Sequence, residues 1–486
     1  MAVNKVVVNG EAIIDLSADT VTANKLAAGY TAHDKSGAVI TGMMDAGGGE
    51  PVRAKDVNFI DYDGTVLYSY TVEEAAALTE LPPLPEHSGL VCQGWNWSLD
   101  SIKSMGRAVE VGAMYITDDG KTRIYIHLED GRTSPMLGCC PNGTVTVDWG
   151  DGTEPDTLTG TSTSTVKWTP THEYSAAGDY VIKLSVNGKV GLAGSNSSDQ
   201  YSYLLRYSSG VDTRNQVYQN AIQMVEIGDS VTSINISAFS HCYSLSLITI
   251  PNGVTSINTS AFSYCYSLSS ITIPDSVTSI SGFTFDGCYS LSSITMPDSV
   301  TSISGFTFRS CYSLSLITIP NGVTSIDDSA FRSCYSLPSI TIPNGVTSIG
   351  NYAFSSCYSL SSITIPDSVI SIKISAFSFC YSLPSITIPN GVTSIGGSTF
   401  YGCYTLPSIT IPNGVTQINT SAFYNCYGVR YYDFTRHTAV PTLSNTNAFN
   451  NISADCEIRV PAALADEWKA ATNWSTYANH IVGVSA

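Results

Sequence analysis

Nine cysteines recur at one fixed interval in the second half of the sequence, each 23 residues after the last. They are Cys242, Cys265, Cys288, Cys311, Cys334, Cys357, Cys380, Cys403 and Cys426. Thiols can form disulfides, but an odd total of 13 with one thiol per repeat favours another arrangement. Buried cysteine behaves as a small apolar residue. The spacing therefore predicts a ladder of reduced, structural thiols inside a repetitive core.

Outside the repeats, few residues have types and spacings suited to chemistry. The adjacent Cys139 and Cys140 could form a vicinal disulfide or mark a strand end. Asp148 and Asp151 share a tight turn, but two carboxylates are too few ligands for a good Ca²⁺ site. The sequence has no GxSxG, HExxH, P-loop or CxxC motif, and its serines have no histidine and acid at a consistent offset. We therefore expect a protein that is not an enzyme and that needs no cofactor or metal.

Composition limits the partners of the chain. Of 486 residues, 43% are hydrophobic and 13% are charged, with a net charge of -18. This balance argues against nucleic acid and anionic lipid as partners. We find no apolar window of about 18 residues and no signal-peptide core near the N-terminus, so we expect neither membrane insertion nor a Sec signal.

The segment 334–356, CYSLPSITIPNGVTSIGNYAFSS, shows how each repeat is built. Its apolar residues fall at fixed offsets and are Cys334, Leu337, Ile340, Ile342, Val346, Ile349 and Phe354. The alternation SITI places Ile340 and Ile342 on one face of a strand and Thr341 on the other. Pro343 then ends the strand. One coil can bury these side chains only against a neighbour, so the repeats predict a stacked solenoid.

Two outward rows also follow the period. A tyrosine row contains Tyr243, Tyr266, Tyr289, Tyr312, Tyr335, Tyr358, Tyr381, Tyr404 and Tyr427. A threonine row contains Thr249, Thr272, Thr295, Thr318, Thr341, Thr364, Thr387 and Thr410. Aromatic rings and hydroxyls suit contact with carbohydrate or protein, but recent duplication would also copy such rows without any selection for binding.

Five positions per repeat differ between copies, three after the isoleucine of VTSI and two before the cysteine. Most charges of the repeats lie there, namely Asp286, Arg309, Asp327, Asp328, Arg332 and Lys373. Drift at tolerant loop positions would explain this variation, and so would an edge that contacts a partner. The candidate binding residues are Arg309, Asp327, Asp328, Arg332, Tyr352, Lys373, Tyr401 and Tyr424 on this edge, with Tyr312, Tyr335, Tyr358 and Tyr381 of the tyrosine row.

The pattern IPxxVtsIgxxAFxxCxxLxxItIP over 230–428 resembles the BspA-type leucine-rich repeat of bacterial surface proteins and adhesins. Residues 429–486 resemble the C-terminal cap of that family. The resemblance implies a strand, Pro461 at a helix start, a short amphipathic helix around Trp468 and a final strand.

The N-terminal part carries a different resemblance. LAAGYTAHDKSGAVITGM at 26–43 is similar to a module of phage tail and fibre proteins, which implies an attachment module over 1–44. A Gly-rich linker at 45–50 and a mixed segment at 51–112, weakly similar to β-grasp modules, follow. Trp95 and Trp97 would share one face of a strand, either in the core or as an exposed glycan platform.

Residues 113–190 alternate as in an all-β sandwich, and VDWGDGT at 147–153 with HEY at 172–174 resembles the immunoglobulin-like PKD domain. That family implies a spacer. The polar segment 191–229 is expected to cover the open end of the solenoid.

The fold class is therefore expected to be mainly β, with a PKD-like sandwich, a leucine-rich-repeat solenoid and a cap. The resemblances together imply a phage or prophage tail adhesin, assembled in the host cytoplasm, that binds a host surface protein or glycan and docks to tail or baseplate proteins. Such fibres are often trimers, although no heptad pattern supports a coiled coil here. The alternatives are a bacterial cell-surface or secreted adhesin and a structural spacer without a ligand.

Overall fold

The computed structural model divides the chain into two compact units, Met1–Asp118 and Asp119–Ala486. It describes residues 3–8, 11–15, 31–34, 39–41, 57–60, 66–85, 90–95, 99, 102–103 and 109–117 of the first unit and residues 119–193, 203–206 and 218–485 of the second. Strands far outnumber helices among the regular elements of these residues, which confirms the mainly β prediction. No helix among them is long and apolar enough to cross a membrane.

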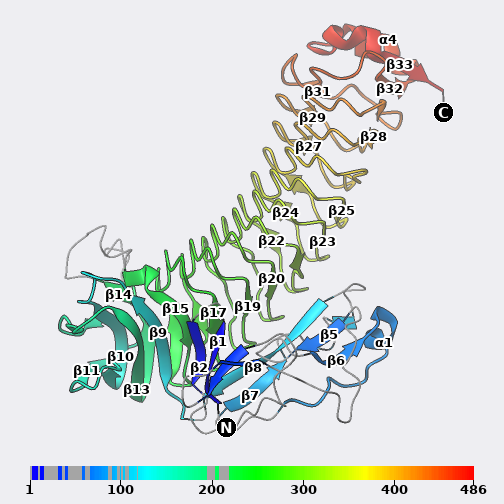
Figure 1. Cartoon of the computed structure of the whole chain (residues 1–486). Helices are drawn as coiled ribbons and strands as arrows, with labels where there is room; N and C mark the ends of the chain where they lie inside the picture. Colours follow the sequence, from blue (N-terminus) through cyan, green and yellow to red (C-terminus); the bar gives the residue numbers. More distant parts are fainter. Residues whose placement is uncertain are drawn as a thin grey trace. The chain divides into compact units, whose positions relative to one another are not determined.

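The described part of the first unit contains two four-stranded sheets (Figure 1). The first, in the order β2-β1-β3-β4, consists of β1 (Val3–Val8), β2 (Glu11–Asp15), β3 (Thr31–Asp34) and β4 (Val39–Thr41). The second, in the order β6-β5-β8-β7, consists of β5 (Val57–Ile60), β6 (Val66–Tyr70), β7 (Leu90–Trp95) and β8 (Val109–Thr117). Helix α1 (Val72–Ala76) follows β6 and begins with a capping box between Thr71 and Glu74.

Trp95 belongs to the core of the first unit. It is 6% exposed, and its ring packs edge-on against Phe59 at 4.9 Å between centroids. Its indole Nε1 donates to the carbonyl oxygen of Pro82 at 2.8 Å. The core-packing interpretation is therefore right for Trp95, and the glycan-platform interpretation is wrong. Trp97 lies outside the described residues.

The second unit begins with an antiparallel sheet in the order β11-β10-β13-β9. Its strands are β9 (Thr122–Leu128), β10 (Met136–Asp148), β11 (Asp156–Thr161) and β13 (Gly178–Leu192), while β12 (Lys167–Trp168) and β14 (Leu205–Arg206) also pair with β10. The alternating burial along β9 places its isoleucines in the core, as expected for a sheet with one covered face. Cys139 and Cys140 lie within β10 as buried free thiols.

This sheet continues into the solenoid without a break. Strand β9 pairs antiparallel with β15 (Ile222–Glu226), which pairs parallel with β17 (Leu247–Thr249). Strand β13 pairs parallel with β16 (Val231–Ile234), which pairs with β18 (Ser256–Ile257). The first coil is thus covered by residues of 119–193, as well as by the described part of 191–229. The PKD resemblance and the boundaries between the predicted modules stay predictions.

Two parallel ladders run along the repeats (Figure 1). The SITI segments form β19 (Ser270–Thr272), β20 (Ser293–Thr295), β21 (Leu316–Ile317), β23 (Ser339–Thr341), β25 (Ser362–Thr364) and β28 (Ser408–Thr410). The second ladder, which the sequence analysis did not predict, contains β22 (Ser325–Ile326), β24 (Ser348–Ile349), β26 (Ser371–Ile372), β27 (Ser394–Ile395), β29 (Gln417–Ile418) and β31 (Thr442–Leu443).

The solenoid core contains the residues that the periodicity predicts. In the repeat at 334–356, all seven predicted inward side chains are at most 4% exposed. The phenylalanines stack from coil to coil, as in Phe331 to Phe354 at 5.4 Å between centroids. Each thiol from Cys265 to Cys426 donates to the carbonyl of a phenylalanine in the preceding coil, for example Cys357 Sγ to Phe331 O at 3.2 Å. All nine repeat cysteines are buried and free, which confirms the predicted ladder.

The C-terminal cap has the predicted order of elements. Strand β30 (Tyr431–Asp433) leads to β32 (Glu457–Pro461), followed by η2 (Ala462–Leu464), α4 (Ala465–Ala470), η3 (Trp474–His480) and β33 (Ile481–Val484). Trp468 and Trp474 are fully buried against each other at 5.5 Å. They cover the apolar end of the last coil, which a solenoid needs at each terminus.

Candidate binding surface of the repeat region

The tyrosine row forms one continuous stack. From Tyr243 to Tyr404, neighbouring rings lie 4.5 to 4.9 Å apart and within 8° of parallel. The row includes the candidates Tyr312, Tyr335, Tyr358 and Tyr381, of which Tyr358 is exposed and the others are half-buried. Each inner ring is covered on both faces by its neighbours. The row therefore presents ring edges and hydroxyls to solvent.

This geometry limits what the tyrosine row can bind. A sugar ring or a cation stacks on the face of an aromatic ring, and in the inner tyrosines those faces are occupied. The last ring differs, since Tyr427 is 54% exposed and is tilted by 30° to Tyr404. Burial, followed by the neighbouring tyrosines, raises the pKa of Tyr243, Tyr289 and Tyr381, so these three hydroxyls are uncharged at neutral pH.

The threonine row becomes more accessible toward the C-terminus. Its first three members are half-buried, and the later five, from Thr318 to Thr410, are exposed. These side chains stand on the outer face of the SITI ladder, as predicted from the alternation. They add hydroxyls to the surface but no charge.

The five changing positions of each coil form what we call the variable edge, which in one coil is Gly350, Asn351, Tyr352, Ser355 and Ser356. Two of these positions have positive φ in almost every coil, here Tyr352 at 57° and Ser356 at 61°. Bulky side chains rarely adopt this left-handed conformation, yet Phe283 and Phe306 adopt it at the position of Tyr352. The repeated backbone path thus places different residue types at the same point of each coil.

Near the start of the solenoid, the variable edge carries an aromatic pair and an ion pair. Phe283 and Phe306 stack at 4.5 Å, and the Arg309 guanidinium lies 5.0 Å from the Phe306 ring. Arg309 also binds the buried Asp286 through two hydrogen bonds of 2.7 and 2.5 Å. These bidentate bonds raise the pKa of Arg309 and neutralise its charge. Arg309 is therefore half-buried and engaged within the chain.

The middle of the edge is more open. Tyr352 is 39% exposed, and the Arg332 guanidinium lies 5.2 Å from its ring. Asp328 accepts hydrogen bonds from the backbone and the side-chain nitrogen of Asn351 at 2.7 and 2.9 Å. The remaining candidates of this region, Asp327 and Lys373, are exposed.

Farther along, Tyr401 and Tyr424 stack at 5.1 Å, and Phe379 contacts Tyr401 edge-on at 5.0 Å. The sequence-predicted edge residues thus fall into three neighbouring groups rather than one site. The sequence analysis did not select Phe283, Phe306 or Phe379, although each lies at a changing position.

Changes on the edge are matched between neighbouring coils. A Cβ on Gly287 would lie 2.6 Å from the ring of Tyr264, and a Cβ on Gly402 would lie 3.2 Å from the ring of Phe379. In both cases, an aromatic residue directly before the cysteine of one coil is followed, one repeat later, by glycine at the same position. This pairing is visible in the sequence and indicates that the edge residues are fitted to each other.

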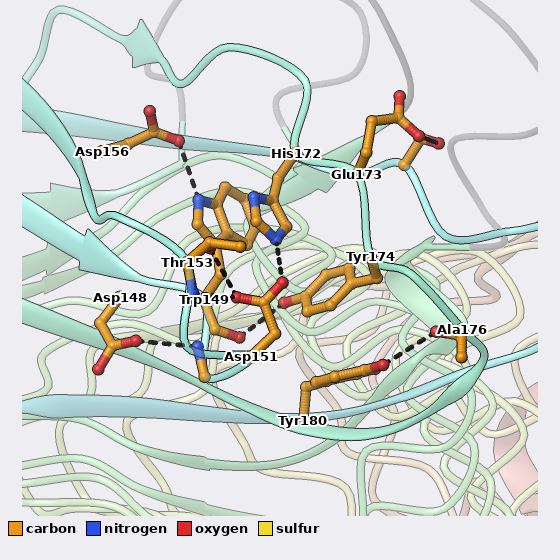
Figure 2. A network of polar contacts seen from close by, with 12 residues as sticks. Asp148, Trp149, Asp151, Thr153, Asp156, His172, Glu173, Tyr174, Ala176 and Tyr180 are labelled. Carbon is orange, nitrogen blue, oxygen red and sulfur yellow. Dashed lines mark hydrogen bonds and ion pairs between the residues drawn. The ribbon is translucent and has the colours of Figure 1, made fainter.

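The turn in the antiparallel sheet is a closed network (Figure 2). Asp151 binds Nε2 of His172 at 2.8 Å and accepts two hydrogen bonds from Thr153. The His172 ring stacks on Trp149 at 4.5 Å, and Tyr174 donates to the carbonyl of Trp149 at 2.9 Å. Burial acts to raise the pKa of Asp151, but the hydrogen bonds outweigh it and lower the pKa. This carboxylate stabilises the turn.

Comparison with known proteins identifies the repeats. Residues 214–338 and 324–455 match a family model described as "BspA type Leucine rich repeat region". No curated protein matches the chain.

Three solved structures are similar. A leucine-rich repeat protein from Bacteroides ovatus is 25% identical with a TM-score of 0.38, over 50% of this chain and 80% of that one. A leucine rich cell surface protein from Faecalibacterium prausnitzii is 26% identical with a TM-score of 0.36, over 60% and 96%. The pneumococcal vaccine antigen PcpA is 14% identical with a TM-score of 0.36, over 62% and 87%.

The family match and the two ladders agree on the same residues. The matched segments span 214–455, from the segment that precedes β15 into the cap, where they end just before β32. The repeat region of this chain belongs to the BspA type leucine-rich repeat family.

Proposed function

We propose that this protein is a non-enzymatic adhesin of a bacterial cell surface, whose repeat region binds a protein or glycan on another surface. The observation that carries the proposal is the variable edge. Core positions repeat from coil to coil, whereas aromatic, aliphatic and charged side chains change along one edge of the same scaffold. Leucine-rich repeats of this family occur in surface proteins, which supports the proposed location.

The residue types on the edge support a binding role. Tyrosine and arginine contribute most of the binding energy at many protein interfaces, especially when they are partly held in place before binding. On this edge, Arg332 and Tyr352 contact each other and Tyr401 stacks on Tyr424. Their conformations are thus largely fixed before a partner arrives.

The virion-bound adhesin is the second candidate, and it rests on the resemblance of 1–44. Only β1 to β4 of that segment are described, and no comparison supports a tail module. Immunogold labelling of producing cells and of particles released from them would separate the two locations. Label on intact cells supports the surface adhesin, and label confined to particles contradicts it.

Binding itself is tested with the labelled full chain, titrated onto bacterial and epithelial cells. We expect saturable binding with a Kd of about 1 μM or tighter, competed by unlabelled chain. An unrelated protein of similar net charge is the control. Absence of saturable binding to every cell type up to about 10 μM would contradict the proposal and favour a spacer.

A further inference from the structure

We propose that Arg332, Tyr352, Lys373 and Ile374 of the variable edge, together with Ile370 just before the edge in the coil of Ile374, are the contact centre for a protein partner that presents apolar side chains beside carboxylates. We call these five residues the Tyr352 patch. The inference rests on the proposed adhesive function and adds a location and a kind of partner.

The first observation is exposed aliphatic surface. Ile370 is 60% and Ile374 is 50% exposed, more than any other large aliphatic side chain among the described residues. Ile370 occupies a position that is threonine in each of the neighbouring repeats, including Thr347 and Thr393. These two isoleucines are not part of the solenoid core, because other side chains of the coil already fill its inward positions.

The second observation is the charge. Between residues 230 and 429 the basic residues are Arg309, Arg332 and Lys373. Arg309 is neutralised by Asp286. Arg332 and Lys373 form no ion pair with any residue that the structure describes, and they lie one and three coils after Arg309. In a chain of net charge -18, Arg332 and Lys373 are thus the basic side chains between residues 230 and 429 that are left to pair with carboxylates of a partner, although Asp327 and Asp328 share the coil of Arg332.

The third observation is that the patch is held in shape. The backbone N–H of Tyr352 donates to the carbonyl of Ile374 at 2.9 Å, so the two side chains stand in adjacent coils. Asn351 binds Asp328 on one side and accepts from the N–H of Ile374 at 3.2 Å on the other. Arg332 lies against the Tyr352 ring. These contacts lower the entropy lost on binding.

The same features favour protein over glycan. Exposed Ile370 and Ile374, of which Ile374 stands in the coil adjacent to Tyr352, offer apolar side-chain contact, whereas sugar binding depends on open ring faces surrounded by polar groups. The Tyr352 ring already has Arg332 against it. A second copy of the chain is disfavoured because both copies would carry the same large negative charge.

The test compares two variants of the full chain in the cell-binding titration. The first variant combines Ile370→Thr with Ile374→Thr, and the second is Arg332→Ser. Each new residue is one that other coils carry at the same repeat position. The matched control is Phe283→Ser with Phe306→Ser, at the repeat position of Tyr352 but outside the patch. All variants should keep the thermal midpoint of the native chain.

We expect the double isoleucine variant to lose affinity by about tenfold or more and the control to lose less than about threefold. Arg332→Ser should weaken binding and reduce its salt dependence. Protease treatment of the cells should abolish binding, and periodate oxidation of their glycans should leave it intact. Native affinity in the patch variants, or loss by periodate alone, would overturn this inference, whereas absence of binding by the native chain would overturn the proposed function itself.

Discussion

The tyrosine row and the variable edge are both aromatic and both face outward, yet they differ in what they can do. In the row, the same residue in every coil places rings 4.5 to 4.9 Å apart and covers their faces. On the edge, residues change between coils, so single rings and isoleucines stay accessible, as in Tyr352 at 39%. Repetition thus builds a closed, stabilising stack, whereas departures from repetition leave groups open for a partner.

The largest effect should come from ionising the repeated interior. Burial raises the pKa of Cys357 and Cys426 to about 12, and it also raises the pKa of Cys265, Cys288, Cys311, Cys334, Cys380 and Cys403 and of several row tyrosines. Unfolded thiols ionise near about pH 8.5, so the unfolded state loses protons first as pH rises. The contribution of these groups to the free energy of unfolding should therefore be constant below about pH 8 and fall steadily toward pH 12. Urea titrations at successive pH values measure this free energy. If it stayed constant up to pH 11, burial would not raise the pKa of the thiols in the ladder.

A single core substitution should have the next largest effect. Phe354 is fully buried between Phe331 and Phe377, at 5.4 and 5.5 Å. Phe354→Ala should cost about 3 to 5 kcal/mol of unfolding free energy, because it removes a stacked ring and leaves a cavity. Chemical denaturation measures the loss. If Phe354→Ala lowered the unfolding free energy no more than an edge substitution does, the core would not stabilise the protein more than the edge.

The fit between neighbouring edge residues predicts a smaller, coupled effect. Gly287→Ala places a Cβ against the Tyr264 ring at a φ of 73°, and should cost about 1 to 3 kcal/mol. Tyr264→Ser should remove the ring contact and recover part of that cost in the double variant. A double-mutant cycle measures the coupling, with Phe379 and Gly402 as a second example. Additive costs would indicate that the edge residues vary independently.

Edge substitutions outside this pairing should have the smallest effect on stability. Tyr352→Ser gives the residue that most coils carry at this position, so the unfolding free energy should change by less than about 0.5 kcal/mol. Tyr335→Ser, in the row, should cost about 1 kcal/mol because two stacked contacts disappear. Thermal unfolding of both variants compares the two surfaces directly. Equal losses of unfolding free energy in the two variants would mean that the tyrosine row does not stabilise the protein more than the variable edge.

Much of the solenoid could be predicted because each side chain is constrained by the same neighbours in every repeat. The period predicted the thiol ladder and the inward positions of 334–356, and the resemblance to the family's C-terminal cap implied the elements around Trp468. The second ladder, of two-residue strands such as Ser348–Ile349, was missed because so short a segment carries little strand pattern. The continuity of β9 with β15 was missed because pairing between distant segments leaves no local pattern in the sequence.

The candidate binding surface was predicted only in outline. The changing positions predicted the location of the surface, but the role of each residue there depends on contacts between coils. Arg309 and Arg332 look equivalent in sequence, yet one is bound to Asp286 and the other lies beside an exposed tyrosine. Ile370 and Ile374 were not predicted, because the sequence does not distinguish an exposed isoleucine from the many buried isoleucines of the repeats.

We propose that the variable edge, on a constant scaffold, makes the protein an adhesin. The decisive measurement is cell binding of a full-length variant in which the edge positions of every coil carry the commonest residue for that position, with the core and the tyrosine row unchanged. We predict that this variant keeps its thermal midpoint and loses saturable binding. A variant that folds and still binds with native affinity would contradict the account.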